Sequence, residues 1–293
     1  MISGAPFRRI SLIGVGLIGG SWGLALKQRA FTGRLTGFDR PPVLDRALAA
    51  GAIDEAAPDL ATAVRGADLV ILAMPVAAIL EQLPQVKESA SPRALVTDTG
   101  STKRMILERA GQFFSDGPLF VGGHPLAGKE QSGIEKAEGA LFEGAQYVLS
   151  ALNPRDLDDE RVVAFLNLIE FVGARPYLCD AETHDRGLAF LSHLPQLVST
   201  ALASMIADED RSHSLPLDLA AAGFRDMTRL AESPYAIWRD VCLSNQDNLQ
   251  QALDALIRKS QAIKGQLAAA GLEEEFKQAS ELRERWRNLK NRE

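Results

Sequence analysis

Three glycines near the N-terminus have the spacing of a dinucleotide-binding loop. Gly14, Gly16 and Gly19 form the pattern G-x-G-x-x-G, directly after an apolar run and just before a helical pattern. The first glycine permits a tight turn, the second lets the backbone approach a pyrophosphate, and the third lets the helix pack on the strand. The N-terminus of that helix would face the phosphates. We therefore predict that this loop, with the intervening Leu17 and Ile18, binds a cofactor.

An acidic residue follows at the distance expected for a ribose contact. Asp39 comes directly after the second predicted strand and 20 residues after Gly19. A carboxylate there would bond the adenosine ribose hydroxyls and would repel a 2′-phosphate. The prediction is therefore NAD, with NADP less favoured, although the neighbouring Arg40 keeps NADP open. The pattern alone also fits a Rossmann-like sheet that binds another nucleotide or none.

A histidine and a hydroxyl group follow two further predicted strands. His124 comes after LFVGG and Ser101 after ALVTDTG. Both should emerge at the carboxyl ends of parallel strands, where ligands bind in open α/β sheets. Beside a nicotinamide, an imidazole can take an alcohol proton while hydride leaves, so these two residues are the predicted catalytic pair. Met74 and Pro75 end another strand and should border the same crevice, unless Pro75 merely begins the next helix.

The first half of the chain alternates short apolar runs with helical patterns. This alternation predicts right-handed β-α-β crossovers and a doubly wound, mostly parallel sheet, an α/β Rossmann fold. The predicted strands are 9–13, 34–38, 68–73, 94–98, 119–123, 146–150 and 174–178. The predicted helices between them are 21–29, 43–50, 77–86, 103–112 and 159–171.

The second half has no strand pattern. Long Ala- and Leu-rich helical patterns cover 184–207, 216–222, 234–264 and 273–287, and 267–272 is typical of a helix end and turn. We predict a dinucleotide-binding domain over 1–181 and an all-α domain over 182–293 that binds substrate and forms a dimer.

Composition limits the class of protein. The 293 residues are 46% hydrophobic and 24% charged, with a net charge of -6, which is typical of a globular protein and argues against a nucleic-acid partner. No apolar stretch was expected to reach the roughly 18 residues of a membrane span. Cys179 and Cys242 form neither a disulfide framework nor a metal cluster. With no signal-peptide pattern, the expected location is the cytoplasm, with no membrane partner and no metal.

Six segments together resemble the prephenate/arogenate dehydrogenases of tyrosine biosynthesis. The resemblance covers nearly the whole chain, and the histidine segment and SHLP are its most specific parts. The segments are GVGLIGGS at 14–21, DTGSTK at 98–103, GGHPLAGKEQSG at 122–133, THDRGLAFLSHLPQ at 183–196, GFRDMTRLAES at 223–233 and IWRDVCLSN at 237–245.

The resemblance implies an oxidoreductase that oxidatively decarboxylates prephenate to 4-hydroxyphenylpyruvate, or arogenate to tyrosine, with hydride transfer to NAD. In that family His124 would match the catalytic histidine that bonds the ring hydroxyl, and Ser101 would orient both. The relatives' helical domain implies a homodimer. The open alternatives are a β-hydroxyacid dehydrogenase of related two-domain build and a non-catalytic NAD-binding redox sensor.

The resemblance also implies substrate contacts. Arg229 would bind a substrate carboxylate, with an interdomain salt bridge as its alternative, and Glu130 would lie at the mouth of the site. His193 and His184 would lie in the helical domain, where capping or structural pairing is an equal alternative for His184. Gln196 stands where many members have the final histidine of SHLPH. A neutral amide cannot become cationic, so the choice between prephenate and arogenate stays open.

Overall fold

The computed structural model describes residues 7–129, 131–269 and 271–290. By their internal contacts these residues divide into two compact units, Met1–Gln246 and Asp247–Glu293. This division does not test the functional boundary predicted at residue 181, which stays a prediction.

An eight-stranded sheet forms the centre of the first unit, and it confirms the predicted α/β fold. Its order is β3-β2-β1-β4-β5-β6-β7-β8, with β6 and β7 antiparallel and the other neighbours parallel. The strands are β1 (Arg9–Ile13), β2 (Arg34–Phe38), β3 (Glu55–Ala56), β4 (Leu69–Leu72), β5 (Leu95–Asp98), β6 (Leu119–Pro125), β7 (Gln146–Ala151) and β8 (Arg175–Leu178). Only β3 was missed, because two exposed residues carry no periodic pattern.

Helices cover both faces of this sheet. One apolar cluster joins the sheet to α1 (Leu17–Gln28), α2 (Pro41–Ala49) and α6 (Glu160–Phe171). The other joins it to α3 (Leu60–Val64), α4 (Val76–Ser89) and α5 (Arg104–Gly111). Successive strand residues belong to opposite clusters, as Leu12 and Ile13 do. Because both faces are buried, the strands are continuous apolar runs in the sequence.

One long helical run follows the sheet. It consists of α7 (Ala181–Leu188), a π-helical turn η3 (Ala189–His193) and α8 (Leu194–His213). The predicted helix 184–207 is therefore longer at both ends. Asp180 begins it as an N-cap, accepting a hydrogen bond from the Thr183 amide at 2.9 Å.

This run corrects one expectation. Its 33 residues, Ala181–His213, include an 18-residue window of mean hydropathy 1.3, so by length and composition it could cross a membrane. The expectation that no stretch is long enough was wrong, because α7, η3 and α8 join without a break. The run also holds five buried polar side chains, and the core helices of globular proteins meet the same test. Those side chains are His184, Asp185, His193, Gln196 and Ser199.

The rest of the helical prediction needs two corrections. The helix predicted over 216–222 is only the short 3-10 turn η4 (Leu217–Leu219), and α9 (Ala222–Thr228) begins where it was expected to end. No residue of η4 is buried, so no packing there favours a longer helix. The helix predicted over 234–264 is broken between α10 (Tyr235–Ser244) and α11 (Gln246–Gln266). The break lies at Asn245, whose buried side chain bonds to Asp185 and His193.

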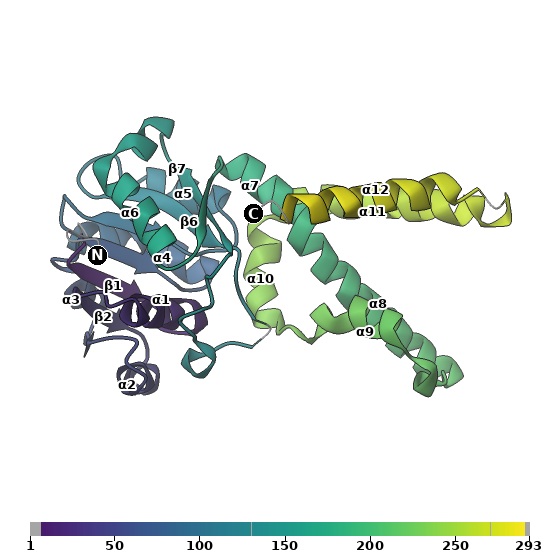
Figure 1. Ribbon diagram of the computed structural model, residues 1–293, viewed down its shortest axis with the longest axis horizontal. Coiled ribbons are helices and arrows are strands. Elements are labelled where there is room, and N and C mark those ends of the chain that lie inside the picture. Colours follow the sequence, from purple (N-terminus) through teal and green to yellow (C-terminus); the bar gives the residue numbers. More distant parts are fainter. Residues whose placement is uncertain (1–6, 130, 270, 291–293) are drawn as a thin grey trace. The chain divides into compact units, whose positions relative to one another are not determined.

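The second unit, Asp247–Glu293, is built from α11 and α12 (Glu273–Lys290), which run side by side (Figure 1). The short turn η6 (Leu267–Ala269) follows α11, in agreement with the helix end predicted there. The Lys259 ammonium contacts the Glu275 carboxylate at 2.8 Å and joins the two helices. Several large apolar side chains of this unit are exposed, among them Leu267, Phe276 and Leu282.

Gly23 offers a test of how closely α1 packs against the segment between α2 and β3. A Cβ at this position would lie 1.9 Å from the backbone oxygen of Ala52. We expect Gly23→Ala to lower the free energy of unfolding by about 1–3 kcal/mol, because backbone must move to admit the methyl group. Urea unfolding measures this. In α5 the nearest atom to a Cβ at Gly111 is 3.5 Å away, so Gly111→Ala is the control and should cost nothing. Equal stability of the two variants would contradict the prediction.

Candidate functional site

The glycine loop has the geometry of a phosphate cradle at the N-terminus of α1. Gly14 has a φ of +89° and its amide donates to Phe38 O at 2.8 Å. A Cβ at Gly19 would lie 1.9 Å from Gly14 O, so only glycine lets the helix start so close to the strand. Beside Gly16, by contrast, no atom lies within 4 Å of where a Cβ would be. The loop therefore leaves open space where the predicted pyrophosphate would approach the backbone.

Asp39 braces this loop as well as following β2. Its Oδ2 accepts from the Val15 amide at 2.8 Å and its Oδ1 from the Arg40 amide at 2.7 Å. Its side chain is 19% exposed, whereas that of Arg40 is 85% exposed. The bond to Val15 was not foreseen from the sequence, because nothing in the spacing says which amide the carboxylate meets.

Met74 and Pro75 lie at the end of β4, next to the loop. A Cβ at Gly14 would meet Met74 Cγ at 2.8 Å, so Met74 borders the glycine turn. Pro75 is the N-cap residue of α4, and its place at the cofactor crevice stays a prediction.

His124, at the end of β6, is linked to two buried residues of α7. His124 Nδ1 lies 2.9 Å from His184 Nε2, and His184 Nδ1 lies 2.7 Å from Asp185 Oδ1. His124 is half-buried, while His184 and Asp185 are 5% and 0% exposed. Desolvation first, and then the neighbouring His184, Lys103 and His193, hold the pKa of His124 well below 6.5. The imidazole is therefore neutral at physiological pH and able to accept a proton.

A buried ion pair holds the backbone on which His124 sits. Lys103 and Asp98 are both fully buried and joined by a salt bridge. The Lys103 ammonium also donates to Gly123 O at 2.6 Å, and the Gly123 amide donates to Asp98 Oδ1 at 3.1 Å. Both charged residues lie in DTGSTK, but spacing alone could not reveal that they fix the residue before His124. Burial raises the pKa of Asp98, and the ammonium and the amides counteract that rise.

His193 and Gln196 lie one turn apart at the junction of η3 and α8, and both are buried. His193 Nδ1 lies 3.2 Å from Asn245 Nδ2, and burial lowers the pKa of His193 to about 4. Gln196 Nε2 donates to Leu230 O at 2.8 Å, which leaves its Oε1 buried without a hydrogen-bond partner in the described structure. Asn245 was not among the predicted residues, although it closes the quoted segment 237–245.

Comparison with known proteins shows which family this chain is similar to. The profile "Prephenate dehydrogenase, nucleotide-binding domain" matches residues 22–178, and "Prephenate dehydrogenase, dimerization domain" matches residues 180–282. The prephenate dehydrogenase of Bacillus subtilis is 36% identical over 260 residues, covering 87% of this chain and 69% of that protein. The chain belongs to the prephenate dehydrogenase family.

Solved structures agree with this membership. Prephenate dehydrogenase from Aquifex aeolicus, in complex with hydroxyphenyl propionate and NAD+, has a TM-score of 0.84 at 29% identity and covers 96% of this chain and 98% of its own. Arogenate dehydrogenase from Synechocystis has a TM-score of 0.79 at 31% identity and covers 95% and 99%. The predicted family is thus confirmed, as is the enzyme class, and the two alternative functions fall away.

In this member of the prephenate dehydrogenase family, not every predicted site residue takes part in the hydrogen bonds around His124. Ser101 is half-buried between β5 and α5, and within the described residues its hydroxyl does not bond to His124, whose Nδ1 partner is His184. Arg229 is exposed at the start of η5 (Arg229–Glu232). The predicted Glu130 lies outside the described residues. Pairing of His184, one of its two predicted alternatives, is what the structure contains.

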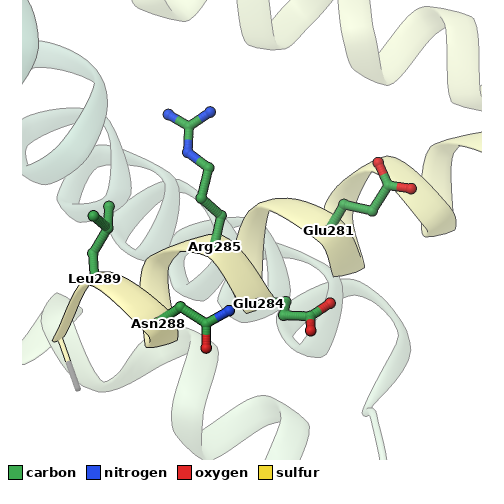
Figure 2. Close-up of a pocket in the computed structure, with 5 residues that line it drawn as sticks. All are labelled: Glu281, Glu284, Arg285, Asn288 and Leu289. Carbon is green, nitrogen blue, oxygen red and sulfur yellow. The ribbon is translucent and has the colours of Figure 1, made fainter. Parts of the chain in front are cut away.

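Within the described residues, neither a metal cluster nor the hollow in Figure 2 adds to this site. Among the residues that the structure describes, no group of three His, Cys, Asp or Glu side chains could hold a metal ion. Figure 2 shows a hollow on α12 whose lining side chains all come from that one helix, and none belongs to the predicted site. They are Glu281, Glu284, Arg285, Asn288 and Leu289.

The buried histidines predict how stability depends on pH. A histidine whose pKa is lower in the folded than in the unfolded state binds more protons when unfolded, so the free energy of unfolding falls as the pH drops. For His193 the window runs from pH 6.5 down to about 4. In that window we expect His193→Gln to reduce the slope of stability against pH by up to about 1.4 kcal/mol per pH unit.

Urea unfolding at fixed protein concentration, repeated across this window, measures that slope. A slope that is the same in His193→Gln and wild type would contradict the burial of a neutral imidazole.

Proposed function

We propose that this chain oxidatively decarboxylates prephenate or arogenate, with hydride transfer to NAD, as a step of tyrosine biosynthesis. The observation that carries the proposal is the neutral His124 at the end of β6, held by a hydrogen bond to the buried His184–Asp185 pair. β1, β4, β5 and β6 are parallel, so His124 and the glycine loop share one edge of the sheet. A dinucleotide bound at the loop would extend along that edge toward the imidazole.

The proposed chemistry depends on the ability of the His124 imidazole to accept a proton. His124 takes the proton of the substrate ring hydroxyl as hydride leaves the same carbon. The ring carboxylate departs as carbon dioxide, and its bonding electrons pass through the ring to the oxygen, which takes the proton back from His124 as the phenol forms. Aromatisation makes the step effectively irreversible. NAD, when bound, supplies the acceptor for the hydride. The protein's main contribution is to hold the ring and the imidazole at reacting distance, which lowers the barrier by several kcal/mol.

The other predicted residues bind and orient the substrate in this proposal. Ser101 bonds the ring hydroxyl, and Arg229 holds a carboxylate by a charge-assisted hydrogen bond. His193 lines the substrate pocket. Gln196 presents an uncharged amide whose Oε1 is unpartnered, where many relatives have histidine, and therefore contacts the side-chain end of the substrate.

NAD rather than NADP fits the cofactor site. Asp39 is held against the glycine loop, so a 2′-phosphate would approach a fixed carboxylate. The open space beside Gly16 fits a pyrophosphate. The match to a nucleotide-binding domain and the NAD+ in the Aquifex aeolicus complex support this assignment.

We further infer that the enzyme is a homodimer built through its helical region. Residues 180–282 match a dimerisation domain, and apolar side chains of α8 to α12 are exposed in the single chain. A two-fold dimer would bury them. The cytoplasmic location, without a nucleic-acid or membrane partner, stays a prediction.

Rates with four substrate and cofactor pairs test the reaction: prephenate and arogenate, each with NAD and NADP. We expect NADH formation with at least one of the two substrates, and slower turnover with NADP. His124→Asn should lower kcat by about 10²–10⁴-fold, because it removes the general base, while NAD affinity stays close to wild type. No turnover of either substrate would refute the reaction, and near-normal kcat of His124→Asn would refute the role of His124.

Sedimentation equilibrium tests the dimer. We expect a species of twice the 31.7 kDa chain mass at micromolar concentration, because the exposed apolar helix faces become buried on association. Leu191, on η3, and Leu219, on η4, are 80% and 78% exposed in the single chain. A Leu191→Glu or Leu219→Glu variant that lies in the interface should shift the equilibrium toward monomer. A single 31.7 kDa species for the wild-type chain would exclude the dimer.

A further inference from the structure

We infer that Asp185 is a positioning residue that acts through His184 to fix the tautomer of His124, so that the Nε2 atom of His124 is the proton acceptor. The inference rests on the proposed function only for its kinetic test. It is carried by the hydrogen bonds that run from α5 through α7 to β6 in the described structure.

The first step is the charge and orientation of Asp185. Its Oδ1 accepts from the Lys103 amide at 2.7 Å and its Oδ2 from the Arg104 amide at 3.0 Å. Backbone amides only donate, so both carboxylate oxygens are acceptors. They lie at the N-terminus of α5, where the helix dipole favours a negative charge. His184 Nδ1, 2.7 Å from Oδ1, must therefore be the protonated nitrogen of its ring.

The tautomer of His184 determines the tautomer of His124. A neutral His184 with its proton on Nδ1 has a lone pair on Nε2. That atom lies 2.9 Å from His124 Nδ1, which must then donate. In a neutral imidazole the other nitrogen is then the acceptor. The lone pair of His124 is thus on Nε2, the atom that does not face His184.

The third step is the rigidity of this arrangement. Asn245 Nδ2 donates to the backbone oxygen of Asp185 at 2.8 Å, and Asp185 is fully buried. On the other side the Lys103 ammonium holds Gly123 O. The imidazole of His124 is therefore constrained through both its ring and its backbone. When His124 takes a proton, the buried carboxylate also stabilises the positive charge that the two imidazoles then share.

Asp185→Asn tests the relay with almost no change of shape. An amide has one oxygen, so it cannot accept from the Lys103 amide, the Arg104 amide and His184 as the carboxylate does. With its oxygen toward the Arg104 amide, its N–H faces His184 Nδ1, which moves the His184 proton to Nε2 and the His124 proton to Nε2 as well. His124 could then no longer accept a proton there. We expect kcat to fall by about 10²-fold or more, with the KM for NAD little changed. A general structural loss would instead change NAD binding and the unfolding midpoint along with kcat.

Glu182→Gln is the matched control. Glu182 lies three residues earlier on the same helix and loses the same charge, but its side chain is 62% exposed and pairs with the Arg104 guanidinium at 3.5 Å. We expect its kcat to stay close to wild type. If Asp185→Asn turns over substrate as fast as Glu182→Gln, the positioning role is wrong.

Two-bond ¹H–¹⁵N correlation spectra of the histidine rings test the inference without substrate. The chain has four histidines, so single substitutions can assign every ring. We expect wild-type His124 to be the Nδ1–H tautomer and His124 in Asp185→Asn to be the Nε2–H tautomer. A wild-type His124 protonated on Nε2 would overturn the inference even if Asp185→Asn did not fold. If neither prephenate nor arogenate is turned over, the proposed function fails, while these spectra still decide the tautomer.

Discussion

The buried carboxylate of Asp185 is the interaction on which the geometry of the site depends. The carboxylate accepts hydrogen bonds from two amides at the start of α5 and from His184, and the backbone oxygen of Asp185 accepts one from Asn245. Three segments that are distant in sequence therefore meet at one residue. A buried polar group is costly unless it is hydrogen-bonded, so each of these contacts stabilises the buried Asp185 side chain in one orientation. The orientation of the His184 and His124 imidazoles follows from that of Asp185.

A second buried charge, the Asp98–Lys103 pair, performs a related task on the sheet. Both residues are desolvated, and amides of Gly100 and Gly123 complete the bonding of the carboxylate. Such a pair contributes little net stability, but removal of one partner typically costs about 3–5 kcal/mol because the other charge stays buried. The pair thus makes the end of β5 and the end of β6 move as one. Ser101 and His124 are attached to those two ends.

At the cofactor loop, the Asp39 carboxylate has two roles in the proposed function. Asp39 braces the Val15 amide of the glycine turn, and in the proposed function it also bonds the ribose. One carboxylate would then hold the loop in shape and select the nucleotide. Selection against a 2′-phosphate depends on that bracing, since a mobile carboxylate could move away from the added charge.

Sequence patterns alone determined the fold class, the family and the place of the predicted catalytic histidine at a strand end. Buried parallel strands are continuous apolar runs, the glycine spacing follows the first strand, and His124 had to lie at a carboxyl end because its strand ends there. The tertiary structure alone decided which group touches which: the partner of His124 is His184 rather than Ser101, and Asn245 interrupts a helix that the pattern predicted to continue. Periodicity and spacing describe a chain along its length, whereas these hydrogen bonds join residues 60 positions apart through burial, which no local pattern records.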